Sequence, residues 1–179
     1  MLITKKGVEY KLEKHELVDE KGNKTGKILT HIEACDPNNI PNGYYISVAG
    51  VVIINDKNEI LLQKRSRFKL SNPGKWGICS GKVNLGETPL VAGIRETLEE
   101  IGILLNTNDL KFLSVYKNKK ARYTVYYVRK NVDINKCKIQ EKELEEVKYF
   151  NIEELKDLDN DGFEWLDNLK KIVPSGMKL

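Results

Sequence analysis

The segment between residues 88 and 102 has the most tightly specified local structure in this sequence. Thr88 is a favourable N-cap residue, and Pro89 suits the first helical position, where a backbone N–H would lack a partner anyway. Gly102 can adopt the left-handed conformation that ends many helices. These signals predict a helix over residues 89–101, against which the rest of the chain has to pack.

The predicted helix separates its residues into an apolar face and an acidic face. At about 100° per residue, one arc of about 80° collects four apolar side chains: Val91, Ile94, Leu98 and Ile101. The opposite side collects three carboxylates within an arc of about 100°: Glu96, Glu99 and Glu100. We expect the apolar face to pack on the core and the acidic face to point outward.

The three carboxylates repel one another, which costs a helix about 0.2–0.5 kcal/mol per neighbouring pair. Within the helix, only Arg95, four residues before Glu99, is placed to offset this repulsion. A bound cation would relieve it, and carboxylate oxygens without histidine or cysteine favour Mg²⁺, or Mn²⁺ in its place, over Zn²⁺. The alternative is an ordinary solvated acidic surface, and the three glutamates alone do not decide between the two.

Most other predicted elements are strands. Residues 44–54 are rich in β-branched and aromatic side chains, which predicts a strand buried on both faces, and a short turn leads to an antiparallel strand over residues 59–65. Further strands are expected over residues 76–80, 111–116, 122–129 and 147–150, and a hairpin turns near Gly22. A short helix over residues 152–155, capped by Asn151, and an amphipathic helix over residues 161–172 follow. This mixture predicts an α+β layered domain.

Composition limits the kind of protein this can be. The 179 residues are 40% apolar and 31% charged with a net charge of +4, too small to indicate a nucleic-acid partner. The apolar runs fall short of the roughly 20 residues that span a membrane. The three cysteines, Cys35, Cys79 and Cys137, form no C-x-x-C pair and predict reduced thiols in a cytoplasmic protein. The sequence leaves open whether the chain forms a homodimer.

The spacing of residues 81–103 resembles the Nudix box of the Nudix hydrolase family. Gly81 is followed at fixed intervals by Glu87, by Arg95 and Glu96, by Glu99 and Glu100, and by Gly102 and Ile103. Thr97 stands where the pattern has an apolar residue, a departure that concerns packing and not chemistry. A weaker resemblance extends from about residue 44 to residue 155.

The resemblance implies a Nudix fold, an α/β/α sandwich with a mixed sheet between helices. It would occupy residues 41–179, with residues 1–40 as an N-terminal hairpin extension packed on it. By position, Glu96, Glu99 and Glu100 would bind the metal together with the Gly81 carbonyl. Glu87 and Arg95 would form an ion pair that fixes the loop to the helix, as structural support.

Some candidates lie outside the box. The general base is expected to be Glu99 or Glu100 if it lies in the box, and Glu143 or Glu146 if it lies in the acidic segment before the last strand. Arg65 and Lys64, at the end of a strand before the box, are candidate phosphate-binding residues. Solvated surface charge is the alternative for all those outside the box, and Trp76 is expected to anchor the core.

The resulting prediction is a Mg²⁺-dependent hydrolase that cleaves a diphosphate linkage in a small molecule, a nucleoside diphosphate derivative. The flanking sequence is also similar to the isopentenyl-diphosphate isomerase branch. In that enzyme, however, an acid cysteine and a metal-binding histidine would fall at Ser80 and Lys82. Cys79 is one residue early and is expected to be a small buried residue. A non-catalytic nucleotide-binding module is the third alternative.

Overall fold

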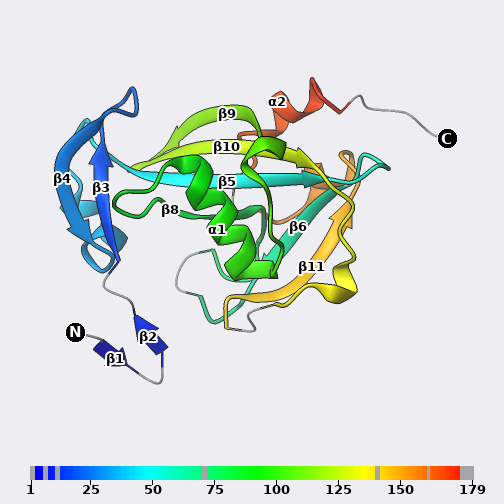
Figure 1. Ribbon diagram of the computed structural model, residues 1–179, viewed down its shortest axis with the longest axis horizontal. Helices are drawn as coiled ribbons and strands as arrows, with labels where there is room; N and C mark the ends of the chain where they lie inside the picture. The colour runs from blue at the N-terminus through cyan, green and yellow to red at the C-terminus, as the bar shows by residue number, and fades with distance from the viewer. Residues whose placement is uncertain are drawn as a thin grey trace.

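The computed structural model describes residues 3–5, 8–10, 13–69, 72–139, 142–160 and 162–173 (Figure 1). The strands are β1 (Ile3–Lys5), β2 (Val8–Tyr10), β3 (Lys14–Val18), β4 (Lys24–Thr30), β5 (Tyr45–Ile54), β6 (Ile60–Arg65), β7 (Trp76–Gly77), β8 (Cys79–Lys82), β9 (Lys111–Asn118), β10 (Ala121–Arg129) and β11 (Leu144–Phe150). The helices are α1 (Pro89–Ile101) and α2 (Leu166–Lys170), with 3₁₀ turns at Glu33–Cys35, Pro37–Asn39, Thr107–Asp109, Ile134–Lys136 and Glu154–Asp157. The predicted α+β class is confirmed.

The large sheet is organised on β5. β10 runs parallel to β5 and pairs with it from residue 46 to residue 54. The other edge of β5 is shared by three antiparallel strands in turn: β3 at residues 45–46, β8 at residues 48–51 and β6 at residues 53–54. β9 and β11 extend the sheet, which gives the order β11-β6-β5-β10-β9. The sheet is therefore mixed, and β8 brings the start of the box onto its central strand.

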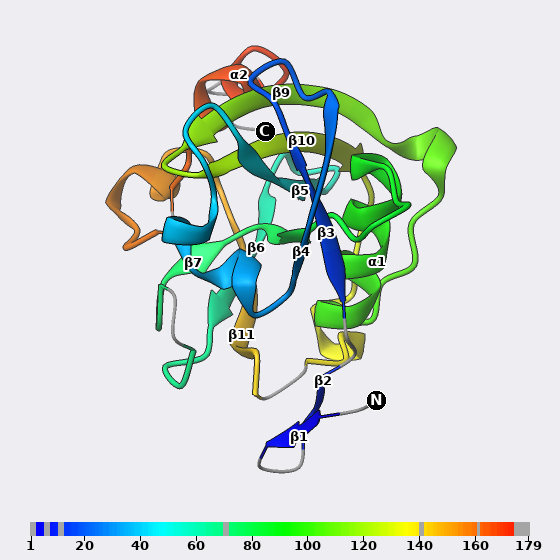
Figure 2. The same cartoon turned by 90° about the vertical axis from the view of Figure 1, so that its left-hand side faces the viewer.

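Both faces of β5 are buried, as its composition predicted. Val51 packs in a cluster that contains Ile101 of α1, whereas the next residue, Val52, packs in a second cluster that contains Trp165 of the C-terminal segment. Neighbouring residues of a strand point to opposite faces. The sheet therefore lies between α1 and the C-terminal segment (Figure 2).

The C-terminal helix is shorter than predicted. Periodicity predicted a helix over residues 161–172, but α2 spans only Leu166–Lys170, and residue 161 lies outside the described residues. Gly162 has a φ of 112°, which lies outside the helical region and prevents the helix from running through it. Within the described part of the chain, no helix combines the length and apolarity that crossing a membrane requires.

α1 has the boundaries that the sequence predicted. The Thr88 hydroxyl accepts a hydrogen bond of 3.3 Å from the N–H of Val91. At the other end, Gly102 adopts φ 75° and ψ 17° and donates its N–H to the Leu98 carbonyl. A residue with a Cβ would be strained in this left-handed conformation, so the stop is encoded by the glycine itself.

The buried face of α1 differs from the predicted one. Val91 and Leu98 are 46% and 45% exposed, whereas Ala92, Gly93 and Thr97 are buried. A Cβ on Gly93 would lie 2.9 Å from Cγ2 of Val51, so the absence of a side chain there lets α1 lie directly on β5. Small residues set the contact face because close approach of helix and sheet excludes large ones.

The N-terminal hairpin is continuous with the sheet. β3 and β4 are antiparallel, and residues 17 and 18 of β3 pair with residues 46 and 45 of β5. The hairpin therefore contributes strands beside the box, as Figure 1 shows at its left. The assignment of residues 1–40 as a separate extension remains a prediction.

Candidate active site

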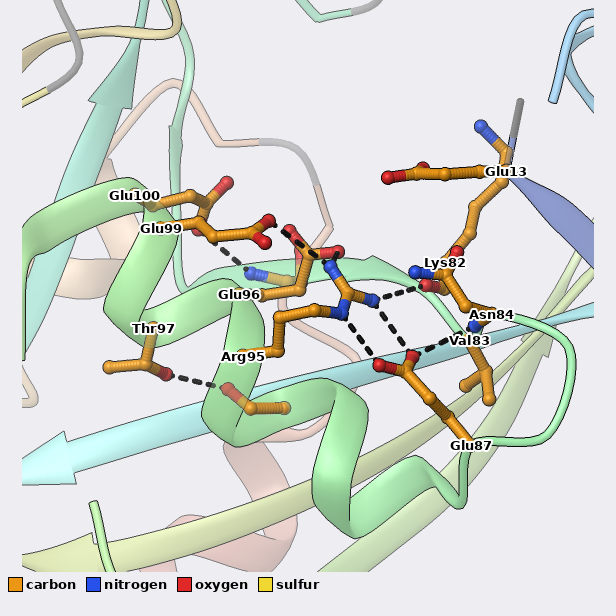
Figure 3. Close-up of polar contacts among 12 residues, drawn as sticks. Glu13, Lys82, Val83, Asn84, Glu87, Arg95, Glu96, Thr97, Glu99 and Glu100 are labelled. Carbon is orange, nitrogen blue, oxygen red and sulfur yellow. Dashed lines mark hydrogen bonds and ion pairs between the residues drawn. The ribbon is translucent and has the colours of Figure 1, made fainter. Parts of the chain in front are cut away.

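Arg95 fixes the box loop to α1. Its Nε and Nη2 donate hydrogen bonds of 2.8 and 3.0 Å to the two carboxylate oxygens of Glu87, and Nη2 also donates to the carbonyl of Lys82 at 3.0 Å (Figure 3). A second anchor comes from the N–H of Asn84, which donates to Glu87 at 3.0 Å. Two parallel hydrogen bonds between a planar guanidinium and a carboxylate fix both the distance between the two groups and their relative orientation. The ion pair that the resemblance implied is present in the structure.

The same guanidinium brings two further carboxylates together. Nη1 of Arg95 donates to Glu96 at 2.7 Å and to Glu99 at 3.2 Å. Burial lowers the pKa of Arg95, but the carboxylates of Glu87 and Glu96 outweigh burial and raise it. Arg95 is therefore permanently charged and holds three carboxylates around itself.

Glu96 lies against β8. A Cβ on Gly81 would overlap the carboxylate of Glu96, so only glycine leaves room for this side chain. The carboxylate is largely buried, and this burial raises the pKa of Glu96 even though Arg95 opposes the shift. The closeness of Gly81 and Glu96 gives a physical reason for the glycine at the start of the box.

Glu100 corrects the predicted outward acidic face. It is only 8% exposed and lies among buried residues between α1 and the sheet. Its Oε2 accepts hydrogen bonds of 2.7 Å from Nε2 of Gln63 and 3.2 Å from the N–H of Ser80, both neutral donors. Burial and the nearby charge of Glu96 raise the pKa of Glu100 to about 8. The side chain of Glu99 is half exposed, and the exposure of the Glu96 side chain lies between those of Glu99 and Glu100.

The three carboxylates fit a hard divalent cation. Glu96 and Glu99 share one nitrogen of Arg95, and the charge of Glu96 acts on Glu100, so the three carboxylates are neighbours on α1. A buried carboxylate with a raised pKa gains from a cation that stabilises its charged form. Oxygen donors of this kind are the ligands that Mg²⁺ and Mn²⁺ prefer.

The candidates outside the box are placed by β11 and the segment before it. Glu143 is ion-paired with Lys69, and its backbone carbonyl accepts a hydrogen bond of 2.8 Å from the N–H of Ser66. Glu146 is exposed on β11 opposite Lys64 of β6. The structure therefore shows Glu143 in an ion pair and Glu146 on the surface, and their catalytic roles remain predictions.

Arg65 and Lys64 point to different faces of β6. Residues of a strand alternate between its faces, so Arg65 lies on the same face of β6 as Gln63, the partner of Glu100, and the charge of Arg65 lowers the pKa of Glu100. The ammonium of Lys64 lies 6.0 Å from the ring centre of Trp76. That ring packs edge-on against Phe150 in the opposite core, as the expected anchor. The structure thus brings Arg65, and not Lys64, to the carboxylates.

Gln63 is the residue near this site that sequence reasoning missed. It is 2% exposed and holds Glu100, while its Oε1 accepts a hydrogen bond of 3.5 Å from the Cys79 thiol. An amide within the otherwise apolar start of a buried strand was the available signal, because buried amides need partners. Thr97, the departure from the box pattern, satisfies its hydroxyl by donating to the Gly93 carbonyl at 2.8 Å.

Known proteins resemble this chain in sequence. An uncharacterized Nudix hydrolase of Listeria monocytogenes is 28% identical over 152 residues, which cover 84% of this chain and 87% of that protein. An isopentenyl-diphosphate Delta-isomerase of Streptomyces avermitilis is 34% identical over 92 residues, but these cover only 49% of this chain and 43% of the isomerase.

Solved structures share the fold. A crystal structure of a protein from Deinococcus radiodurans matches with a TM-score of 0.66 at 19% identity, covering 90% of this chain and 97% of that one. The NUDIX domain of NrtR from Shewanella oneidensis, crystallised with ADP ribose, matches with a TM-score of 0.61 at 16% identity, covering 80% and 99%. The NUDIX domain model matches residues 44–169, which is more than half of the chain. The chain therefore belongs to the Nudix hydrolase family.

Proposed function

We propose that the protein hydrolyses a diphosphate linkage in a nucleoside diphosphate derivative and uses Mg²⁺ to do so. The proposal is supported by the neighbouring carboxylates of Glu96, Glu99 and Glu100 on α1, with Glu96 against Gly81, and by the ion pair of Arg95 and Glu87 that joins the loop to the helix. With a divalent cation bound, such a site would suit a small anionic substrate, which the carboxylates alone would repel. The three free cysteines agree with a cytoplasmic protein.

The residues of the site have separate tasks in this proposal. Glu96, Glu99, Glu100 and the Gly81 carbonyl would hold Mg²⁺, which when bound neutralises the diphosphate, polarises phosphoryl oxygens and makes bound water more acidic. Arg95 keeps its contact with Glu87 and so maintains the loop at a fixed distance from the helix. Arg65 on β6 carries a positive charge that acts on Glu100, and it is the proposed contact for substrate phosphate.

The attacking water has to lose a proton to a carboxylate. Glu99 has a half-exposed side chain, whereas Glu100 is enclosed and bonded to Gln63 and a backbone N–H. Glu99 is therefore the better placed of the two box candidates to meet water, and Glu143 is the candidate outside the box. Glu143→Gln separates these assignments, because removing a general base lowers turnover by about 10²–10⁴-fold, whereas Glu99→Gln would also remove a proposed metal ligand.

The isomerase alternative has a specific observation against it. Proton transfer to carbon needs an accessible acid, and Cys79 is 5% exposed with its thiol bonded to Gln63. Burial, with the nearby charge of Glu100, raises the pKa of Cys79 well above its ordinary value. Ser80 and Lys82 stand where the resemblance would require cysteine and histidine. The local chemistry therefore favours hydrolysis.

A screen of diphosphate compounds tests the proposal. Nucleotide sugars, dinucleoside polyphosphates, nucleoside triphosphates and isopentenyl diphosphate are incubated with and without Mg²⁺, and the products are separated and identified by anion-exchange chromatography, because cleavage of the first two classes releases phosphomonoesters and no free phosphate. At least one nucleotide is expected to be cleaved only with Mg²⁺, and Glu100→Gln should abolish the cleavage while leaving the circular dichroism spectrum unchanged. Tight nucleotide binding with no cleavage of any compound would instead establish a non-catalytic binding module.

A further inference from the structure

A second group of potential metal ligands lies on the N-terminal hairpin. Glu13 immediately precedes β3, His15 lies on β3, and His31 immediately follows β4. Each residue offers a ligand atom, and these three atoms all lie within 4.8 Å of one another. None of the three belongs to the box, and the box ligands include no imidazole.

The separations suit a metal held by nitrogen and oxygen. Nε2 of His15 lies 3.2 Å from Nδ1 of His31, which lies 3.5 Å from a carboxylate oxygen of Glu13. A tetrahedral Zn²⁺ with bonds of about 2.0–2.1 Å requires ligand atoms about 3.3 Å apart. Two of the three separations are therefore already close to those of a metal site.

The environment of His15 fixes which of its nitrogens can bind. Its Nδ1 lies 2.9 Å from the Val83 carbonyl, which can only accept a hydrogen bond, so Nδ1 carries the proton. In the neutral ring, Nε2 then presents its lone pair toward His31. Metal-binding histidines usually donate the N–H of the nitrogen that does not bind the metal to a backbone carbonyl or a carboxylate. His15 is 1% exposed, so the surrounding packing holds the ring in this orientation.

Some of the features around the cluster would favour metal binding, and others would oppose it. Burial lowers the pKa of His15 and of His31, which keeps both rings in the neutral form that binds metal. The ammonium of Lys82 lowers both values further and would repel a cation, whereas the Glu13 carboxylate would attract one. The Nζ of Lys82 lies 3.4 Å from the Cys35 sulfur, at the end of a flexible four-carbon stem, and we expect it to turn away from the cluster when a cation binds.

We propose that Glu13, His15 and His31 form a second metal site, selective for a transition-metal dication such as Zn²⁺. Three protein ligands leave a fourth position for solvent. The imidazole donors distinguish this site from the all-oxygen box site, because imidazole suits Zn²⁺ and carboxylate alone suits Mg²⁺. On binding, neutral His31 presents the lone pair of Nδ1 and carries its proton on Nε2.

The site would connect the hairpin to the box. His15 is bonded to the carbonyl of Val83, which directly follows β8, and Figure 3 shows the Glu13 carboxylate pointing toward Arg95 and Glu96. The negative charge of Glu13 already contributes to the raised pKa of Glu96. A cation on Glu13 would therefore tie both ends of the hairpin together and reduce the negative charge beside the box.

The experiment uses the untagged full chain, which contains only two histidines. Zn²⁺ binding is titrated by competition with a chromophoric chelator in millimolar Mg²⁺, and Co²⁺ absorption reports the ligand geometry. We expect one equivalent of Zn²⁺, a tetrahedral Co²⁺ spectrum and a rise in melting temperature. His31→Ala and Glu13→Gln should each weaken binding by about 10–100-fold or more.

Glu99→Gln is the matched control, because it removes a box carboxylate and leaves the hairpin cluster intact. It should keep the Zn²⁺ affinity of the wild type, and Lys82→Met should bind Zn²⁺ more tightly by removing a repelling charge. Zn²⁺ binding that is insensitive to His31→Ala, or that is lost in Glu99→Gln, would overturn the proposal. So would the absence of Zn²⁺ binding in the presence of Mg²⁺. None of these readouts depends on hydrolysis, so they stand apart from the proposed function.

Discussion

Gln63 on β6 holds Glu100 of α1 through a hydrogen bond of 2.7 Å from its amide nitrogen to the carboxylate. The orientation of the amide is set from both sides. Its nitrogen also donates to the Ile78 carbonyl at 3.3 Å, and its oxygen accepts from the Cys79 thiol at 3.5 Å. The neutral amide of Gln63 thereby holds the Glu100 carboxylate, which is enclosed between α1 and the sheet, in one orientation.

Replacing Gln63 is expected to weaken metal use. The hydrogen bond from Gln63 lowers the pKa of Glu100, so in the nearly isosteric Gln63→Met that pKa should rise further. More of the carboxyl is then protonated at neutral pH and unable to bind a cation. The Mg²⁺ concentration for half-maximal activity should rise about tenfold or more. The acidic limb of the pH profile should also move to higher pH. A variant with reduced activity but an unmoved pH profile would show that Gln63 acts only on stability.

Gly81→Ala should displace Glu96 from the site. The added Cβ would overlap the Glu96 carboxylate, which would have to move away from β8. We expect activity to fall by at least about 10²-fold with little change in melting temperature, because the side chain can rotate toward solvent. The double variant with Glu96→Gln provides the control, since two changes that act on one contact are not additive. If the loss of activity in the double variant equalled the product of the losses in the two single variants, Gly81 and Glu96 would act independently and the proposed displacement would be wrong.

The stability of the metal-free protein should fall as pH rises. The pKa of Glu100 is about 8 in the folded protein, whereas its ordinary value is 4.5. Between these values the folded state retains a proton that the unfolded state has released, so the free energy of unfolding decreases with increasing pH. The raised pKa of Glu96 acts in the same direction. Urea denaturation with a chelator present should show the decline between pH 5 and pH 8.

Glu100→Gln should flatten this slope and make the metal-free protein more stable at pH 8, by about 2–4 kcal/mol. Mg²⁺ should reverse the effect for the wild type, because a cation stabilises the charged carboxylate. An equal slope in the wild type and in Glu100→Gln would show that another group carries the titration.

Removing Arg95 should cost far more stability than removing a surface cation. Arg95→Met leaves Glu87 and Glu96 without their partner in a largely buried environment, and about 2–4 kcal/mol should be lost in urea denaturation. Lys170→Met is the matched control. Its ion pair with Asp167 lies on the exposed face of α2 and should contribute at most about 0.5 kcal/mol. Similar losses in the two variants would mean that the Arg95 network is not structural.

The sequence predicted local features better than packing. The ends of α1 depend on Thr88 and Gly102, whose side-chain and backbone properties act within a few residues, and both predictions were confirmed. The buried face of α1 depends on how closely β5 approaches the helix, and the sequence of the helix alone does not determine that distance. Ala92 and Gly93 therefore replaced the larger Val91 as the contact residues.

The same limit applies to the site. Motif spacing located Arg95 and Glu87 and anticipated their ion pair, because both belong to one contiguous segment. It could not reveal that Gln63, on a distant strand, holds Glu100, or that His15 and His31 meet across the hairpin. Contacts between segments far apart in sequence depend on strand register, and register is decided by the whole sheet.

One edge of β5 carries both the hairpin and the box, since residues 45–46 pair with β3 and residues 48–51 pair with β8. The two partners are separated by a single residue of the same strand. Side chains of a strand alternate between faces, so inserting one residue at position 47 would invert the hairpin relative to the carboxylates. A change of length at the hairpin tip would disturb only the local contacts of residues 20–22 with Arg122 and Lys117, whereas any change of frame within β5 would alter the position of the hairpin relative to the carboxylates.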